Sequence, residues 1–305
     1  MVSSNHYIEE YKMDLNCTEW VQTISDPLLL EKYKRLKQLL LDMKQVIIAY
    51  SGGIDSAFLL KVAQITLADQ CIALTAVSES YAPWEREEAQ KLAMEIGAKQ
   101  IEVFTKELDN PSYRANVGDR CYHCKTALFD TAVLTQTEYP GVLCYGAISD
   151  DLGDDRPGMK AAQERGIRAP LIEAGLYKAD IRILAKALGL RIWDKPASAC
   201  LSSRFPYGTQ IDAQKLDQIT RCEGKIRALG LIHFRARFHE KLLRLEFGPK
   251  ELERVFAEAS LRDALIQIGK SVGFQYVTLD LAGYRMAGQS EMESGLVQIG
   301  SKSLT

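Results

Sequence analysis

Residues 51–56, Ser-Gly-Gly-Ile-Asp-Ser, have the composition of a phosphate-binding loop. They follow an apolar run at 46–50, typical of a buried strand, and they lead into a predicted helix at 55–68. The two glycines let the backbone approach an anion, and the amides of a helix start and two serine hydroxyls can hold phosphate oxygens. The Lys-Ser/Thr ending of a Walker A loop is missing, and the pattern is not GxGxxG. A purely structural Gly-Gly turn is the alternative.

Three cysteines stand in segments that suit metal or sulfur chemistry. Cys121 and Cys124 form a CxxC pair near a predicted helix start, a spacing that places two sulfurs on one metal or allows dithiol exchange. Cys200 lies in the segment 196–208, whose small and turn-forming residues favour presenting a side chain. Three thiolates with no clear fourth ligand fit a 4Fe–4S cluster with one open iron better than a closed zinc site. Ordinary thiols are the alternative for the CxxC pair, and His123 is expected to pack rather than ligate.

The elements that must position these residues alternate between strand and helix through the first two thirds of the chain. Strands followed by helices predict a parallel sheet covered on both faces, which is an α/β domain of Rossmann-like design. The predicted strands are 46–50, 72–78, 101–104 and 142–146, and the predicted helices are 28–44, 55–68, 84–97, 123–137, 157–165 and 178–188.

The order of elements changes after about residue 205, which predicts a smaller α+β domain. Its expected elements are a helix at 212–229, an antiparallel pair at 234–239 and 242–247, a helix near 249–268 and a strand at 274–281. The segment 196–208 is the expected junction, and junctions often hold sites. We therefore predict a flexible leader at 1–25, a nucleotide-binding domain at 26–205 and a second domain at 206–305.

Composition excludes several classes of protein. The chain has 305 residues, 47% hydrophobic and 26% charged, which allows a sizeable core. A net charge of −2 does not favour a dedicated nucleic-acid binder, and no apolar run approaches the roughly 18 residues of a membrane span. Seven cysteines are too few for a disulfide scaffold, and the N-terminus resembles neither a signal nor a transit peptide. A cytoplasmic protein is expected, with Cys71, Cys144 and Cys222 buried as small apolar residues.

Together these motifs resemble one family. Ser-Gly-Gly-Ile-Asp-Ser matches the PP-loop of ATP pyrophosphatases, and the segments 120–125 (RCYHCK), 150–158 (DDLGDDRPG) and 196–204 (PASACLSSR) are similar to the LarE family of ATP-dependent sulfur transferases. That family contributes to the nickel-pincer nucleotide of lactate racemase. The resemblance runs from about residue 25 to residue 290.

The resemblance implies an enzyme that uses ATP and Mg²⁺. ATP adenylates a carboxylate of pyridinium-3,5-biscarboxylic acid mononucleotide, releasing pyrophosphate, and a sulfur nucleophile then displaces AMP to leave a thiocarboxylate. The resemblance also implies a homo-oligomer and a small-molecule nucleotide substrate, with a sulfide donor or cysteine desulfurase as a possible partner. The residues implied for the pyrophosphate are Ser51, Gly52, Gly53, Asp55 and Ser56, and Asp55 orients the loop or helps to hold magnesium.

The cysteines decide which type of member this is. Some members have a single cysteine at the position of Cys200 and sacrifice its sulfur, while others also carry the CxxC pair and hold a 4Fe–4S cluster on three cysteines. Because Cys121, Cys124 and Cys200 are all present, the resemblance implies the cluster type, with sulfide on the open iron as the sulfur donor. Sacrifice of the Cys200 sulfur stays open.

The second domain supplies candidate substrate residues. Arg235 and Arg237 alternate on one predicted strand face, with Glu246 on the next strand, and arginine binds phosphate or carboxylate in a bidentate manner. A solvated face with cross-strand ion pairs is the alternative. The resemblance adds Arg204, Asp280 and Arg285. After Arg285 the chain departs from the family's usual Gly-Ser-Met-Asn-Glu, with Met-Ala-Gly-Gln-Ser-Glu at 286–291.

Three rival functions are compatible with the loop. A PP-loop tRNA thiolase can also use three cysteines and a 4Fe–4S cluster, but it needs a basic surface that a pI of about 6.2 does not indicate. An ammonia-fed synthetase would need no thiol cluster. A nucleotide-sensing module without turnover would bind ATP and release no pyrophosphate.

Overall fold

The computed structural model describes residue 24 and residues 26–153, 157–196 and 198–284. Residues 1–23 and 25 of the expected leader, Arg285 and the segment 286–291 lie outside the described residues. Contacts divide the chain into two compact units, Met1–Lys195 (unit 1) and Pro196–Thr305 (unit 2). The segment expected as the junction, 196–208, belongs to unit 2 in this division. The domain boundary expected between residues 205 and 206 stays a prediction.

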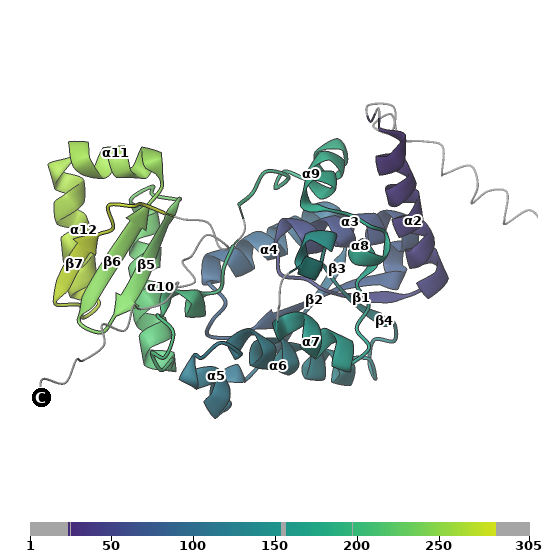
Figure 1. Ribbon diagram of the computed structural model, residues 1–305, viewed down its shortest axis with the longest axis horizontal. Helices are drawn as coiled ribbons and strands as arrows, with labels where there is room; N and C mark the ends of the chain where they lie inside the picture. The colour runs from purple at the N-terminus through teal and green to yellow at the C-terminus, as the bar shows by residue number, and fades with distance from the viewer. Residues whose placement is uncertain (1–23, 25, 154–156, 197, 285–305) are drawn as a thin grey trace, which may run out of the picture. The chain divides into compact units, whose positions relative to one another are not determined.

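Unit 1 contains a four-stranded parallel sheet (Figure 1). The strand order is β3-β2-β1-β4, with the bounds β1 (Val46–Ala49), β2 (Cys71–Val77), β3 (Lys99–Phe104) and β4 (Val142–Tyr145). The chain runs from β1 through β2 to β3 on one side and then returns to place β4 beside β1 on the other. The carboxyl ends of β1 and β4 therefore form a topological switch point, the place where open α/β sheets bind their ligands.

Helices cover both faces of this sheet, as the sequence predicts (Figure 1). On one face lie α2 (Pro27–Met43), α3 (Ile54–Leu67), α4 (Pro83–Ile96), α8 (Pro170–Glu173) and α9 (Lys178–Ala187). On the other face lie α6 (Arg120–Thr135) and α7 (Pro157–Glu164), and the short α5 (Pro111–Ala115) contacts α6. The sequence did not predict α5 or α8, each of which is five residues or fewer.

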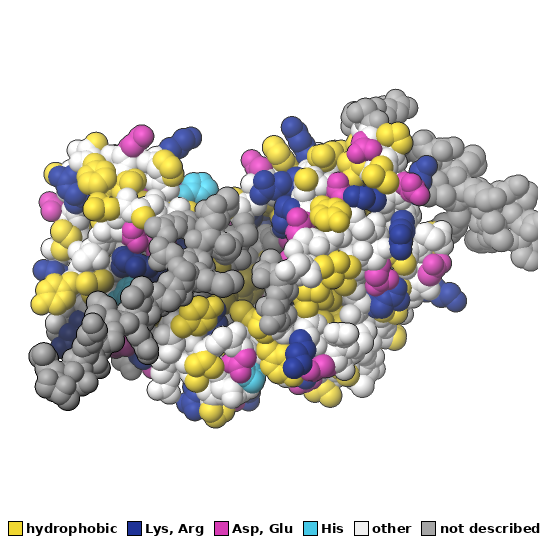
Figure 2. Space-filling model, viewed as in Figure 1, with side chains coloured by type: hydrophobic (Ala, Val, Ile, Leu, Met, Phe, Trp, Pro, Cys, Tyr) yellow, Lys and Arg dark blue, Asp and Glu magenta, His cyan; other side chains and the backbone are white. Residues whose placement is uncertain are grey.

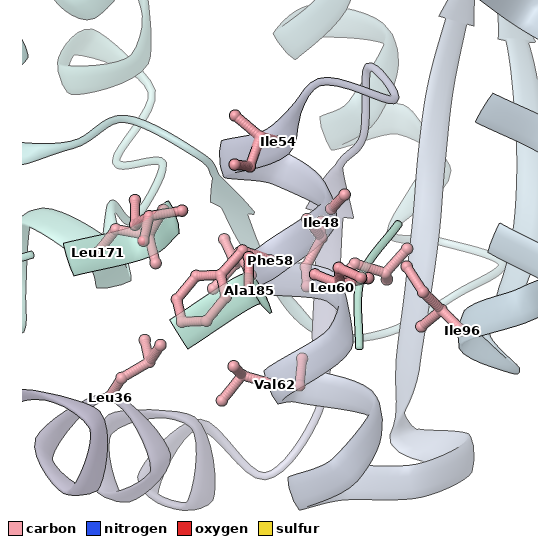
Figure 3. Packing of buried hydrophobic residues seen from close by; sticks show 14 of the residues in the cluster. Leu36, Ile48, Ile54, Phe58, Leu60, Val62, Ile96, Leu171 and Ala185 are labelled. Atoms are coloured by element: carbon pink, nitrogen blue, oxygen red, sulfur yellow. The ribbon is translucent and has the colours of Figure 1, made fainter. Parts of the chain in front are cut away.

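The larger core of unit 1 is built around α3. Phe58, Leu60 and Val62 of α3 are fully buried and pack among Leu36 of α2 and Ile48 of β1 (Figure 3). Because α3 is apolar on almost every side, it lies between the sheet and its neighbouring helices rather than at the surface. Burial of this helix fixes its N-terminus, which is where residues 51–56 lie.

Unit 2 has a three-stranded sheet of order β5-β6-β7 with helices against one face. β5 and β6 pair antiparallel as predicted, and β7 pairs parallel to β6. The bounds are α10 (Ala213–Ala228), β5 (Phe234–His239), β6 (Leu242–Phe247), α11 (Pro249–Ala257), α12 (Ala259–Ser271) and β7 (Tyr276–Leu279). The single helix predicted near 249–268 is wrong, since two helices meet at Glu258, whose φ of −101° and ψ of 102° are extended.

The surface carries charges of both signs. On the face shown in Figure 2, Lys and Arg side chains of unit 1 are interspersed with Asp and Glu side chains. None of the helices in the described parts of the chain has the length and apolar character needed to cross a bilayer.

Candidate functional site

The loop 51–56 connects β1 to α3 at the carboxyl edge of the sheet. The hydroxyls of its two serines are hydrogen-bonded to each other, with the Oγ atoms of Ser51 and Ser56 3.2 Å apart. Ser56 Oγ also donates to the carbonyl oxygen of Gly53 at 3.1 Å and accepts from the amide of Ser51 at 3.3 Å. The loop is therefore pre-organised around the first turn of α3, whose N-cap residue, Gly53, has no side chain to cap the helix amides. These amides are available to an anion.

Neighbouring elements approach this loop so closely that two glycines are required. Gly52 has a φ of +73°, and a Cβ at this position would lie 2.7 Å from Cβ of Ala89 on α4. Gly146 follows β4, and a Cβ there would lie 2.8 Å from the Ser56 amide nitrogen. A hydrogen bond also joins α4 to the residue before the loop, since the Tyr50 hydroxyl donates to the Ala89 carbonyl oxygen at 3.0 Å. The loop therefore lies between α4 and the end of β4.

We expect Gly52→Ala to disrupt this loop. A positive φ alone costs an alanine about 1–2 kcal/mol, and overlap with Ala89 adds to that cost. The matched control is Gly97→Ala, because Gly97 has a φ of +83° with nothing within 4 Å of its Cβ position. Urea unfolding and ATP titration of both variants measure the effect. If both variants lost the same stability and Gly52→Ala still bound ATP, the close approach of Ala89 to Gly52 would not be what requires a glycine there.

An ion pair joins the loop to α9. Lys178 Nζ donates to both carboxylate oxygens of Asp55, at 2.6 and 2.5 Å. Burial raises the pKa of the Asp55 carboxyl above its ordinary value, and Asp150 and Asp151 add to that shift, while Lys178 opposes it. Asp150 and Asp151 belong to the segment η5 (Ser149–Gly153), which follows β4. The structure thus surrounds the loop's carboxylate with one ammonium and two further carboxylates.

The CxxC pair lies in the first turns of α6, which begins at Arg120 rather than at the predicted residue 123. Cys121 is exposed and Cys124 is partly exposed, and both are thiols. A spacing of three residues places them on the same side of a helix. The imidazole of His123 contacts a carboxylate instead, because its Nε2 lies 3.0 Å from Oδ2 of Asp119.

Cys200 is an exposed thiol in unit 2, immediately before the short helix η6 (Leu201–Arg204). The guanidinium of Arg204 holds its backbone, since Nη1 donates to the carbonyl oxygens of Ala199 at 2.8 Å and of Cys200 at 3.2 Å. Arg204 is in turn held by the buried carboxylate of Glu223 on α10, at 2.8 and 3.0 Å. Although burial opposes its charge, Glu223 keeps the pKa of Arg204 above its ordinary value. The structure therefore places Arg204 as the support of the Cys200 segment.

Charged side chains gather on the face of the unit 2 sheet to which the alternation of β5 assigns Arg235 and Arg237, and Arg235 and Glu246 are buried there. The register sets Arg235 opposite Glu246, and Arg237 donates to both Glu246 oxygens at 2.9 and 3.0 Å. Arg237 also donates to the carbonyl oxygen of Ser203 at 2.7 Å, which connects this face to the Cys200 segment. Arg237 and Glu246 thus form the cross-strand pair that the alternative interpretation expected.

Arg235 is different, because no carboxylate in the described part of the chain forms an ion pair with its buried guanidinium. It is 3% exposed, and its Nη2 donates no hydrogen bond among the described residues. Its guanidinium lies over the ring of Tyr284, 4.9 Å from the centroid. Burial lowers the pKa of Arg235 below its ordinary value, and Arg237 and Arg204 lower it further. A buried guanidinium with an unused donor suits an anionic ligand.

Asp280, at the end of β7, lies on the same face. Its Oδ2 is 3.5 Å from Arg244 Nε, and its Oδ1 accepts from the amide of Ala282 at 2.9 Å. Arg244 also contacts Glu246 at 3.1 Å, so Asp280 joins the chain of charges that includes Arg237. The further residue expected here, Arg285, lies outside the described residues.

The other described cysteines are buried as expected and suit no metal. Burial raises the pKa values of Cys71, Cys144 and Cys222 each to about 12, so these thiols stay protonated at neutral pH. Among the described residues, no three His, Cys, Asp or Glu side chains are gathered closely enough to hold a metal ion.

Two site residues escaped the sequence analysis. Lys178 carries no local signal, since it is a lysine at the first position of an ordinary amphipathic helix. Glu223 did carry a signal, because it interrupts the apolar stripe of Leu216, Ile219 and Ile226 on a predicted helix. A carboxylate at a core position indicates a buried cationic partner.

Comparison with known proteins places the chain among its relatives. No protein-family model matches it. It is 36% identical over 246 residues, covering 80% of this chain and 88% of the relative, to the pyridinium-3,5-bisthiocarboxylic acid mononucleotide synthase of Lactiplantibacillus plantarum. The chain belongs to the LarE family. The family resemblance predicted from its motifs is thereby confirmed, and so is the α/β fold class.

Two further relatives of this LarE chain cover most of its length. An uncharacterized protein of Synechocystis is 43% identical over 83% of the chain and 95% of the relative. An uncharacterized protein of Methanocaldococcus jannaschii is 30% identical over 79% of the chain and 91% of the relative.

Proposed function

We propose that this chain is a sulfur transferase that converts the two carboxylates of pyridinium-3,5-biscarboxylic acid mononucleotide into thiocarboxylates at the expense of ATP. The observation that carries the proposal is the similarity to a protein named pyridinium-3,5-bisthiocarboxylic acid mononucleotide synthase. The matched region covers 80% of this chain and 88% of that relative. The loop at the start of α3 supports the use of ATP, because its amides and hydroxyls are arranged for phosphate.

The proposed reaction has two steps. A substrate carboxylate oxygen attacks the α-phosphorus of ATP, and pyrophosphate leaves. A sulfur nucleophile then attacks the activated carbonyl carbon, and AMP leaves with the carboxylate oxygen. Loop residues 51–56 would hold the β,γ-phosphates, and Asp55 would hold Mg²⁺ bound to them. Sulfur held by the protein acts at high effective concentration, which replaces a bimolecular encounter.

The proposed sulfur source is a 4Fe–4S cluster held by Cys121, Cys124 and Cys200. The donor set fits, because these three thiols are exposed or partly exposed while Cys71, Cys144 and Cys222 are buried. The assignment of the three ligands rests on the sequence resemblance. When bound, such a cluster would supply sulfide from its open iron. An external sulfide donor in the reducing cytoplasm would then reload it, so that one protein molecule could act repeatedly.

The charged face of the unit 2 sheet, which carries Arg235 and Arg237, is the proposed site for the anionic groups of the substrate. Arg235 supports this role best, because its buried Nη2 donates to none of the residues that the structure describes. Arg237, Glu246 and Asp280 would shape the charge around it, and Arg204 would act through the Cys200 backbone. The family resemblance favours a homo-oligomer.

The experiment that tests this function follows pyrophosphate and nucleotide products together. Purified full-length protein is incubated anaerobically with Mg²⁺, ATP and the biscarboxylic acid mononucleotide. We expect pyrophosphate and AMP in equal amounts, released only with the mononucleotide, and a product that mass spectrometry shows to have sulfur in place of oxygen. Pyrophosphate release that depends on transfer RNA and not on the mononucleotide would favour a tRNA thiolase.

Iron content tests the sulfur source. Anaerobically purified protein is expected to carry about four irons and four inorganic sulfides per chain, and Cys121→Ala is expected to lose them. Cys222→Ala is the matched control, because Cys222 is buried in α10. Iron-free wild-type protein that loses the sulfur of Cys200 during one turnover would overturn the cluster in favour of sacrifice.

A further inference from the structure

Lys178 is a cationic side chain that contacts the phosphate loop. Its Nζ lies 2.6 and 2.5 Å from the carboxylate oxygens of Asp55, although 123 residues separate the two in the sequence. Asp55 is in the first turn of α3, where the amides of a helix start attract phosphate. A rotation of the Lys178 side chain could therefore bring its ammonium to a phosphate held at the start of α3.

The backbone of Lys178 is fixed, while its side chain has room to turn. Its amide donates to Asp150 Oδ2 at 2.7 Å, and the preceding amide of Tyr177 donates to Asp180 Oδ2 at 3.0 Å. Asp180 is itself anchored by Lys32 Nζ at 2.6 Å. The Lys178 side chain is 35% exposed, so its four-carbon stem can redirect the ammonium without movement of α9.

A structural role for this ion pair is a weak explanation. The side chains of Lys178 and Asp55 are 35% and 27% exposed, so solvent reaches both partners and screens their attraction. The packing of α9 does not need the pair, since Ile181, Leu184 and Ala185 are fully buried in the same core as α3. The pair therefore adds little to the attachment of α9, and a ligand that competes for the ammonium can break it at small cost.

Asp55 and a bound phosphate would compete for that ammonium. We propose that Lys178 is a pyrophosphate-binding residue of this loop, paired with Asp55 when the loop holds no phosphate and turned to the β,γ-phosphates when ATP binds. The inference rests on the proposed use of ATP. In this arrangement the ammonium neutralises the charge of the leaving pyrophosphate, and Asp55 becomes available to the metal ion that accompanies the nucleotide.

The test measures binding rather than turnover. Inorganic pyrophosphate is titrated calorimetrically into the full-length protein, once with EDTA and once with Mg²⁺. Lys178→Met is expected to weaken pyrophosphate binding about 10- to 100-fold, because a charge-assisted contact is lost, and Lys178→Arg should recover most of the affinity. Lys186→Met is the matched control, because Lys186 is at the other end of α9 and lies over the ring of Trp193.

A second variant predicts an effect of opposite sign. Asp55→Asn leaves Lys178 in place and removes its competitor, so metal-free pyrophosphate binding should become several-fold tighter, while binding in Mg²⁺ should weaken. Circular dichroism confirms the fold of each variant. Wild-type affinity in Lys178→Met, or unchanged metal-free affinity in Asp55→Asn, overturns the role of Lys178. If wild-type protein binds neither pyrophosphate nor ATP, the proposed function of the loop fails instead.

Discussion

Replacing Cys200 with alanine is expected to lower formation of the thiocarboxylate product by at least about 10³-fold while pyrophosphate release continues. The reason is that the thiol is exposed, whereas the hydrogen bonds that Arg204 donates to residues 199 and 200 go to their backbone oxygens. Alanine keeps those oxygens, so the segment should keep its conformation. Product mass spectrometry and a pyrophosphate assay on the same reaction separate sulfur transfer from adenylation.

A matched comparison sharpens this result. Cys222→Ala removes a thiol that is buried in α10, so it should change stability and leave product formation within a few-fold of wild type. Cys121→Ala distinguishes the two sulfur sources, because cluster delivery requires it and sacrifice of Cys200 does not. Full product yield from Cys200→Ala would contradict both sources and move the sulfur donor elsewhere.

The largest loss of stability is expected from Glu223→Gln. Glu223 is fully buried, accepts from Nε and Nη2 of Arg204, and accepts from the amide of Ala236 on β5 at 3.1 Å. Removing its charge leaves the Arg204 guanidinium buried and uncompensated, which costs about 3–5 kcal/mol in comparable pairs. Urea unfolding followed by circular dichroism should show this loss in the transition that includes unit 2.

Two companion variants test the cause. Glu253→Gln makes the same chemical change at an exposed position of α11 and should alter stability by no more than about 0.5 kcal/mol. The double variant Glu223→Gln with Arg204→Met removes the orphaned charge and should recover part of the loss. A double variant less stable than Glu223→Gln alone would show that contacts of Arg204 to the Cys200 segment outweigh its desolvation.

Much of the fold was predictable because it depends on local pattern. The apolar run before residue 51, the glycines after it and the alternation of strands and helices are short-range signals, and each corresponds to an observed element of unit 1. The loop residues could be found for the same reason. The antiparallel pair of β5 and β6 was also found, since alternation over six residues on each strand marks one buried face.

Part of what sequence could not predict depends on partners far along the chain. Lys178 meets Asp55 only because the topology of the sheet places the start of α9 beside the carboxyl end of β1. The break between α11 and α12 is different, because its partner is local: Arg262 donates to the carbonyl oxygens of Val255 and Phe256 at 2.9 and 2.7 Å and completes the end of α11. Neither partner is marked by spacing or composition.

The guanidinium of Arg204 has a consequence for the lifetime of the protein. It holds the Cys200 segment through carbonyl oxygens, and none of those hydrogen bonds includes the sulfur atom. An iron-free molecule that has surrendered that sulfur, or has had it oxidised or alkylated, therefore keeps the same hydrogen bonds and should melt at the same temperature. Quality-control proteases recognise unfolded chains, so they would not distinguish spent molecules from active ones. Inactive protein would then accumulate unless a chemical step restores the sulfur.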